Sequence, residues 1–151
     1  MIDAFTGRFE FLSNFFVDAN GFCAEVEFQA LKSTCHQDYD YVRGAYSFSI
    51  AKIPREAKRR GRKIKLRDDW DEIKLEVMRG IIETKFSPLV MRNLLLSTGH
   101  HKLVEGNWWH DIYWGVCNGS MRVSRCPGHE PQGKNHLGLI LMEVREKLRN
   151  G

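Results

Sequence analysis

The stretch DWDEIKLEVMRGIIETK, residues 69–85, predicts a long helix at the centre of the fold. Its apolar residues recur mostly three or four positions apart, so on a helix they form one broad stripe: Trp70, Ile73, Leu75, Val77, Met78, Ile81 and Ile82. Asp68 or Asp69 suits the N-cap, because a carboxylate accepts a free backbone N–H of the first turn. We therefore expect a helix that begins near Asp69 and buries its stripe.

Further helices are predicted on both sides of this one. Pro54 and Pro88 suit the first turn of a helix, and Gly61 and Gly99 suit its end. Together with the apolar periodicity, these signals predict helices over residues 24–35, 38–46, 54–61, 88–97 and 137–148.

Short strands are expected between the helices. The phenylalanines of residues 9–17 suggest strands, and Asn20-Gly21 before Phe22-Cys23 predicts a hairpin turn. Residues 102–105 and 113–117 are the best later strands, and residues 119–133 form a loop rich in Gly, Pro and Ser. We expect an α+β fold that is predominantly helical, with short N-terminal and later β-hairpin strands in one domain of residues 1–151.

Composition sets broad limits on the class of protein. A chain of 151 residues with 42% hydrophobic and 28% charged residues is ordinary for one globular domain. The apolar runs are too short to span a membrane, and the N-terminus lacks the apolar run of a signal peptide, so a cytoplasmic protein without a membrane partner is expected. The net charge of +4 fits a phosphate-bearing ligand or a nucleic acid but requires neither.

The four cysteines are widely spaced and form no C-x-x-C pair, so reduced and mostly buried thiols are expected. Cys117, Cys126 and His129 could surround a zinc ion. Their spacing matches no common zinc finger or ribbon, and no metal site is therefore predicted.

Glu25, Gln29 and Lys32 are spaced i, i+4 and i+7, which places them on one stripe of the predicted helix. Two turns, about 10 Å, separate the acid from the amine, so the two could face one ligand from its two ends. The alternative is a solvated polar face, and Glu27 on the opposite side competes for the role of the acid.

A basic run follows, with seven cations in residues 58–67 that either grip phosphates or form a solvated helix end. A third candidate is the stretch GNWWHDIYWGVCNG, residues 106–119. There Asp111 lies among aromatic rings, where a carboxylate is costly unless it is paired or used. The alternative is a loop acid with packed neighbours. Asn14, between aromatic residues, either caps a turn or reaches into a pocket.

These segments together resemble the NADAR (YbiA-like) family of N-glycosidases. The matching pieces follow one order along the chain: Leu12-Ser13-Asn14-Phe15, Glu25 with Gln29-Ala30-x-Lys32, Leu66-Arg67-x-Asp69-Trp70, Asp111-x-x-Trp114-Gly115 and Asn135-x-Leu137-Gly138. Two departures stand out. Val26 replaces the histidine that follows the acid in the family, and residues 120–132 form a longer segment than in many relatives.

The resemblance implies hydrolysis of the bond between ribose C1 and a base nitrogen in a phosphorylated ribosyl-base compound, either a riboflavin-pathway intermediate or an ADP-ribose adduct. It also implies that Lys32 forms a Schiff base with the opened sugar, while Glu25 and Asp111 handle protons and positive charge in an order left open. The expected substrate-binding residues are Asn14, Gln29, Arg62, Arg67, Trp70, Trp114, Gly115 and Asn135. No metal or redox cofactor is needed.

Two other functions remain open at this stage. One is hydrolysis of ADP-ribosyl-guanine in nucleic acid, as a repair or antitoxin enzyme, which the extra Arg122 and Arg125 favour. The other is a non-catalytic module that binds ADP-ribose or a nucleotide, which would not require the set of Glu25, Lys32 and Asp111. A nucleophilic Lys32 needs a lowered pKa, which an apolar pocket or cationic neighbours would supply.

Overall fold

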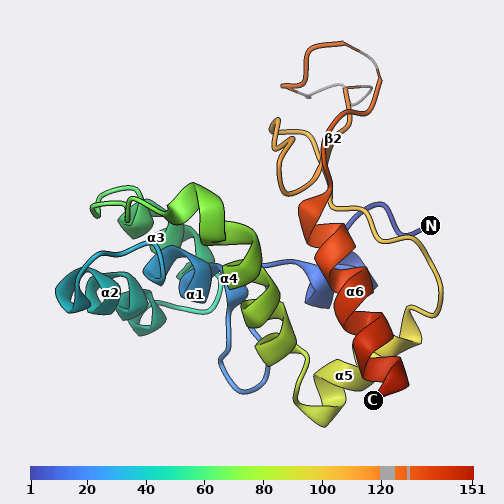
Figure 1. The fold of residues 1–151 in the computed structure, drawn as a ribbon, viewed down its shortest axis with the longest axis horizontal. Helices are drawn as coiled ribbons and strands as arrows, with labels where there is room; N and C mark the ends of the chain where they lie inside the picture. The colour runs from blue at the N-terminus through green and yellow to red at the C-terminus, as the bar shows by residue number, and fades with distance from the viewer. Residues whose placement is uncertain (120–124, 129) are drawn as a thin grey trace. The chain divides into compact units, whose positions relative to one another are not determined.

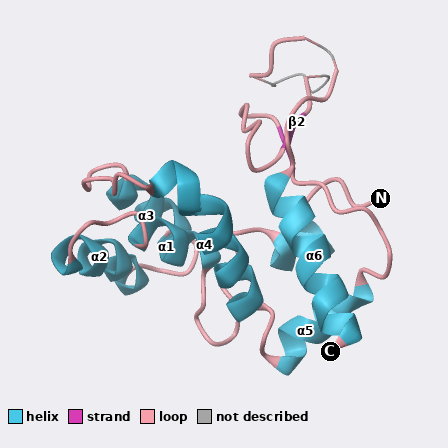
Figure 2. Ribbon diagram, in the orientation of Figure 1, coloured by secondary structure: helices cyan, strands magenta, loops and turns pink. Residues whose placement is uncertain are grey.

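The computed structural model describes residues 1–119, 125–128 and 130–151, and helices dominate it (Figures 1 and 2). The helices are α1 (Ala24–Ala30), α2 (His36–Arg43), α3 (Ile53–Gly61), α4 (Trp70–Lys85), α5 (Leu89–Ser97) and α6 (His136–Asn150), with 3₁₀ turns η1 (Gly7–Leu12) and η2 (Gly44–Ser47). Strands β1 (Gly106–Asn107) and β2 (Val116–Cys117) form one small sheet. The predicted helical α+β class is confirmed.

The chain forms two compact units. We call Asn14–Ser87 the central unit and Met1–Ser13 with Pro88–Gly151 the terminal unit. Each is described by itself, and the single domain over residues 1–151 stays a prediction. No helix in the described part of the chain is long and apolar enough to cross a membrane.

Helix α1 is the hub of the central unit, because it contacts α2, α3 and α4 (Figure 1). The core at its contacts with α2 and α3 consists of small and branched side chains: Cys23, Val26, Ala30, Val42, Ala45, Ile53 and Ala57. Helix α4 buries Trp70, Met78, Ile81 and Ile82 of the predicted stripe. Its first turn differs from expectation, since Asp69 occupies the N-cap without a side-chain cap bond and binds Arg67 instead.

Helix α1 is shorter than its predicted range of residues 24–35. The Ser33 hydroxyl and its backbone N–H both donate to the Ala30 carbonyl, at 2.7 and 3.2 Å. A serine that binds the carbonyl three residues back competes with continuation of the helix. Lys32 consequently lies in the turn that follows α1 rather than on the helix itself.

The terminal unit combines α5, α6 and η1 with the sheet. Strands β1 and β2 are parallel, with Gly106 opposite Val116 and Asn107 opposite Cys117, so the expected later hairpin is wrong. The predicted strand at residues 102–105 is reduced to a bridge between Ile2 and Leu103. Phe9 and Phe11 lie in η1 rather than in a strand, because neighbouring Phe11 and Leu12 are both buried and do not alternate between two faces.

The turn predicted at Asn20-Gly21 is present and is flanked by an antiparallel bridge between Val17 and Cys23. The expectation of four reduced thiols is wrong, because Cys117 and Cys126 form a disulfide. Cys23 is a buried free thiol and Cys35 an exposed one. A separation of nine residues, without a C-x-x-C pattern, gives no sequence signal for such a pair.

Candidate functional site

The polar stripe of α1 is buried rather than solvated. Glu25 is 7% exposed and Gln29 4%. The Gln29 Nε2 group donates to Glu25 Oε1 at 2.7 Å, and the Lys32 ammonium donates to Gln29 Oε1 at 2.8 Å. The amide of Gln29 therefore links the acid to the amine through two hydrogen bonds.

The competing acid, Glu27, has a different role. Its Oε1 accepts hydrogen bonds from Arg43 and from the Tyr46 hydroxyl. These contacts tie α1 to residues at the end of α2 and in η2. Glu27 is therefore occupied in packing of the central unit, and Glu25 is the acid that faces Gln29.

Two neighbouring segments hold the stripe in place. A Cβ atom on Gly61, at the end of α3, would lie 2.1 Å from Gln29 Oε1, so only glycine permits this approach. Beyond α1, the Arg67 backbone N–H donates to the Lys32 carbonyl at 3.0 Å, and Ser33 bridges to Leu66. The backbone on both sides of the Lys32 side chain is thereby fixed.

The Lys32 amine lies beside aromatic rings. Its Nζ is 5.2 Å from the centroid of Phe28 and 6.0 Å from that of Trp70, and the two rings are 4.9 Å apart. Burial lowers the pKa of Lys32 below its ordinary value, and the charges of Lys58, Arg62 and Lys74 lower it further against the opposing effect of Glu25. This is the environment that a nucleophilic lysine requires.

Asn14 lies at the start of the same helix. Its carbonyl accepts the Glu25 backbone N–H at 2.9 Å, and its Nδ2 group contacts the Met78 sulfur at 3.6 Å. No residue that the structure describes donates to its buried Oδ1. A buried amide oxygen that accepts no hydrogen bond costs stability, and it is suited to accept one from a ligand.

The basic run divides by its partners. Arg59 and Arg60 bind Glu56, and Arg67 binds both oxygens of Asp69 at 2.6 and 2.9 Å. Arg62 is exposed, and no described carboxylate pairs with it. Of the two arginines predicted to bind phosphate, Arg62 is the more accessible.

In the terminal unit, Asp111 organises its own loop. Its Oδ1 accepts the backbone N–H groups of Tyr113 and Trp114 at 3.1 and 2.9 Å. The Asn107 side chain brackets it, donating to the Asp111 carbonyl at 2.7 Å and accepting its N–H at 3.0 Å. Within the described part of the chain, no group donates to Asp111 Oδ2, so one carboxylate oxygen is left for other work.

Gly115 and Asn135 shape the same region. A Cβ on Gly115 would lie 2.2 Å from the Glu105 carbonyl oxygen, so a side chain there would separate β2 from the β1 segment. Asn135 is left-handed, with φ of 55°, and its amide binds the backbone of Leu103 and Glu105 at 2.9 and 3.0 Å. Trp114 is half-buried, edge-on to Tyr113 at 4.9 Å. Substrate contacts by these residues stay predictions.

The terminal unit contains a cavity of about 390 Å³. Trp108 and Trp109 line it and are 40% and 45% exposed, with Asn107 forming another part of its wall. With this exposure, neither ring is part of the core. In the sequence, the adjacent tryptophans are the signal for this cavity, but they match no motif of the family.

The predicted residues are thus divided between the units. The central unit brings Asn14, Glu25, Gln29, Lys32 and Trp70 around the start and end of α1, with Arg62 and Arg67 nearby in sequence. Asp111, Trp114, Gly115 and Asn135 belong to the terminal unit.

Comparison with known proteins extends this picture. A family model described as NADAR domain matches residues 10–149. N-glycosidase YbiA of Escherichia coli (strain K12) is 40% identical over 90 residues, which cover 59% of this chain and 49% of that protein. The Riboflavin biosynthesis protein PYRR, chloroplastic, of Zea mays is 37% identical over 106 residues, covering 66% of this chain and 15% of that protein.

The fold has a solved counterpart. The NMR structure of E. coli YbiA matches with a TM-score of 0.71 and 31% identity, covering 99% of this chain and 88% of that chain. The chain spans about half the length, or less, of these two curated relatives.

Proposed function

Because the chain belongs to the NADAR family, we propose that it is an N-glycosidase that hydrolyses the bond between ribose C1 and a base nitrogen. Relatives named N-glycosidase support the reaction class. The observation that carries the assignment is the hydrogen-bonded chain from buried Glu25 and Gln29 to half-buried Lys32, in which the pKa of the amine is lowered.

In the proposed reaction, the neutral amine of Lys32 attacks ribose C1. The base nitrogen leaves with the bonding electron pair and takes up a proton, while the amine loses a proton as the sugar ring opens to a Schiff base. Water then hydrolyses the imine, which releases the sugar and restores the amine. In this proposal one of Glu25 and Asp111 supplies the proton and the other stabilises developing positive charge.

The proposed substrate is a phosphorylated ribosyl-base compound. The relative named as a riboflavin biosynthesis protein favours a metabolite over an ADP-ribose adduct. Arg62, which lowers the pKa of Lys32 and is exposed, is a suitable phosphate ligand. The Oδ1 atom of Asn14, to which no described residue donates, would accept a hydrogen bond from a sugar hydroxyl.

The tryptophan-lined cavity would hold a flat ring by stacking. Stacking of a base on an aromatic side chain is worth about 1–3 kcal/mol, so Trp109→Ala should raise KM roughly 5- to 150-fold with little change in kcat. An unchanged KM would show that the cavity does not bind the substrate. Ala substitution of Trp70, whose ring is buried against Phe28, is unsuitable for this test because it would also damage packing.

Chemical trapping tests the proposal. The protein is incubated with a ribosylamino-pyrimidine 5′-phosphate or with ADP-ribosyl-guanosine in the presence of borohydride, and adducts are mapped by mass spectrometry. We expect turnover of the first substrate and an adduct on Lys32, lost in Lys32→Ala and kept in the control Lys63→Ala, an exposed lysine of the same unit.

Each other outcome has a definite meaning. Turnover without an adduct on Lys32 would refute the Schiff base. Turnover of ADP-ribosyl-guanosine alone would identify the alternative hydrolase, for which Arg125 lies among the described residues and Arg122 outside them. Binding of ADP-ribose without turnover of either substrate would identify a non-catalytic module.

A further inference from the structure

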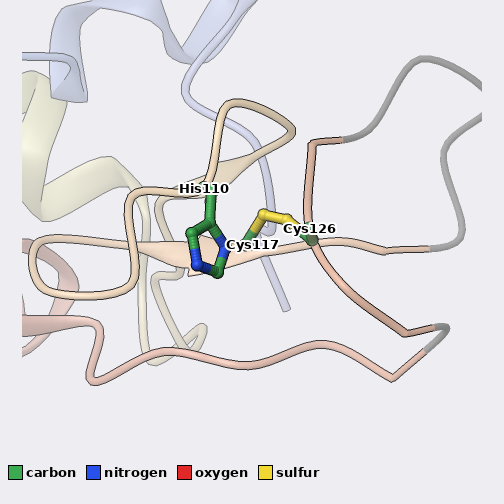
Figure 3. A group of neighbouring side chains, drawn as sticks. All are labelled: His110, Cys117 and Cys126. Atoms are coloured by element: carbon green, nitrogen blue, oxygen red, sulfur yellow. A yellow bond between two sulfur atoms is a disulfide. The ribbon is translucent and has the colours of Figure 1, made fainter.

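Three side chains outside the proposed glycosidase chemistry lie together in the terminal unit. His110, Cys117 and Cys126 each offer one ligand atom, and these atoms all lie within 4.8 Å of one another. They come from the loop after β1, from β2 and from residues 125–128 (Figure 3). Among the described residues, this is the group of His, Cys, Asp and Glu side chains that is close enough to share a metal ion.

The cluster contains more than a disulfide requires. Cys117 and Cys126 are joined, and an S–S bond between them needs no third partner. Figure 3 nevertheless shows the imidazole of His110 turned toward the sulfur pair. His110 also has a φ of 69°, a left-handed conformation that is uncommon for residues other than glycine. The loop therefore places a nitrogen ligand beside two sulfur ligands.

The positions of the three ligand atoms permit a tetrahedral metal ion once the disulfide is open. With Zn–S bonds of about 2.3 Å and a Zn–N bond of about 2.0 Å, two sulfurs and a nitrogen bound to one zinc are roughly 3.5–3.8 Å apart. All three separations fall inside the 4.8 Å limit that the cluster satisfies. Opening the S–S bond would free the two sulfurs to separate to this distance, and the Cα atoms of the two cysteines are 6.0 Å apart.

The charges suit zinc as well. Cys117 is fully buried and Cys126 is 9% exposed, so two thiolates there would be costly without a cation. Two thiolates and a neutral imidazole balance the charge of Zn²⁺. Sulfur and imidazole ligands also disfavour Mg²⁺ and Ca²⁺, which take oxygen ligands.

We propose that His110, Cys117 and Cys126 form a zinc site when the two cysteines are reduced, with the disulfide as its oxidised form. An external thiol reductant opens the S–S bond and is itself oxidised to a disulfide, leaving two cysteine thiols. Each thiol passes a proton to solvent as it binds Zn²⁺, and a water molecule or another ligand completes the tetrahedron.

The proposed ion would link three segments of the terminal unit. It joins the loop that contains Asp111, next to His110, to β2 and to residues 125–128. This goes beyond the glycosidase proposal, because no step of that reaction passes through the metal. Its failure would leave the assignment of Lys32 intact, and the reverse also holds.

The site is tested on the full chain, purified in a phosphine reductant without chelator. We expect about one zinc per chain by elemental mass spectrometry. Cys126→Ser and His110→Ala should lower zinc content severalfold at neutral pH, while Cys35→Ser, which removes an exposed free thiol, should keep it. Co²⁺ added to the metal-free protein should give the sulfur-to-metal charge-transfer absorption of thiolate ligands, and Cys126→Ser should weaken it.

A second measurement avoids dependence on variants that misfold. Zinc added to the reduced wild-type chain should slow hydrogen exchange in residues 106–118 and should leave α1 and α4 unchanged. Reduced wild-type protein that takes up no stoichiometric zinc would overturn the proposal, as would equal loss of zinc in Cys35→Ser. Isolation from reducing buffer with the Cys117–Cys126 bond intact and no metal would identify a purely structural disulfide and also overturn it.

Discussion

The amide of Gln29 should stabilise the central unit through its two hydrogen bonds, and Gln29→Met isolates that contribution. Methionine has an unbranched side chain of similar length, which fits against Gly61 as glutamine does. Its sulfur donates no hydrogen bond and accepts only weak ones. The variant removes the 2.7 Å bond to buried Glu25 and the 2.8 Å bond from half-buried Lys32.

The expected loss follows from these two bonds. A hydrogen bond to a buried charged group contributes about 1.5–3 kcal/mol, and one to a partly exposed amine about 0.5–1 kcal/mol because water replaces it. Extra apolar burial by methionine offsets about 1 kcal/mol. We expect a net loss of roughly 1–3 kcal/mol in the free energy of unfolding.

Urea denaturation followed by circular dichroism measures the effect. The matched control is Gln37→Met at an exposed position of α2, which should change stability by less than about 0.5 kcal/mol. If the two variants lose the same stability, the Gln29 amide does not hold the acid and the amine together. The central role given to this side chain would then be refuted.

Three further predictions concern charge, backbone and the loop acid. The charge of Glu25 raises the pKa of Lys32, so Glu25→Gln should lower that pKa further. The pH dependence of reductive methylation at Lys32 should then shift to lower pH. A shift to higher pH would contradict the effect assigned to the Glu25 charge. Gly115→Ala should destabilise the fold by about 1–3 kcal/mol in thermal unfolding, because its Cβ would meet the Glu105 carbonyl, whereas Gly80→Ala on α4, with open space around it, should be neutral or stabilising. Asp111→Asn should fold like the wild type, since its side-chain oxygen can still accept the two N–H groups, yet lose kcat at least 100-fold; full activity would exclude a role for the charge.

Much of the helical framework could be predicted, because the sequence signals of a helix lie within or beside the helix itself. The stripe of α4 and the prolines at the starts of α3 and α5 lie within a few residues of the structure they specify. The i, i+4, i+7 spacing also placed Glu25, Gln29 and Lys32 correctly on one side, although α1 ends before Lys32. The turn after α1 still brings residues i and i+3 together, so Lys32 donates a hydrogen bond to Gln29 although it lies outside the helix.

The predictions that were wrong failed because another partner competed, either close in the sequence or far from it. Asp69 caps nothing with its side chain because Arg67 offers a stronger, charged donor. The parallel pairing of β1 with β2 and the bond between Cys117 and Cys126 join residues that no local sequence pattern brings together. The cavity beside Trp108 and Trp109 is likewise a property of segments brought together from residues 3–6, 13, 105–109 and 118.

The loop of residues 107–117 explains how a short irregular segment could present a carboxylate accurately. Asn107 fixes its beginning through two hydrogen bonds to the Asp111 backbone, and it is also part of the cavity wall. Cys117 fixes its end in β2, and the proposed zinc site would add a tie at His110. Each tie lowers the conformational entropy that substrate binding would otherwise have to remove. Because the turn uses only Oδ1 of Asp111, the loop can be rigid while Oδ2 stays available to a substrate.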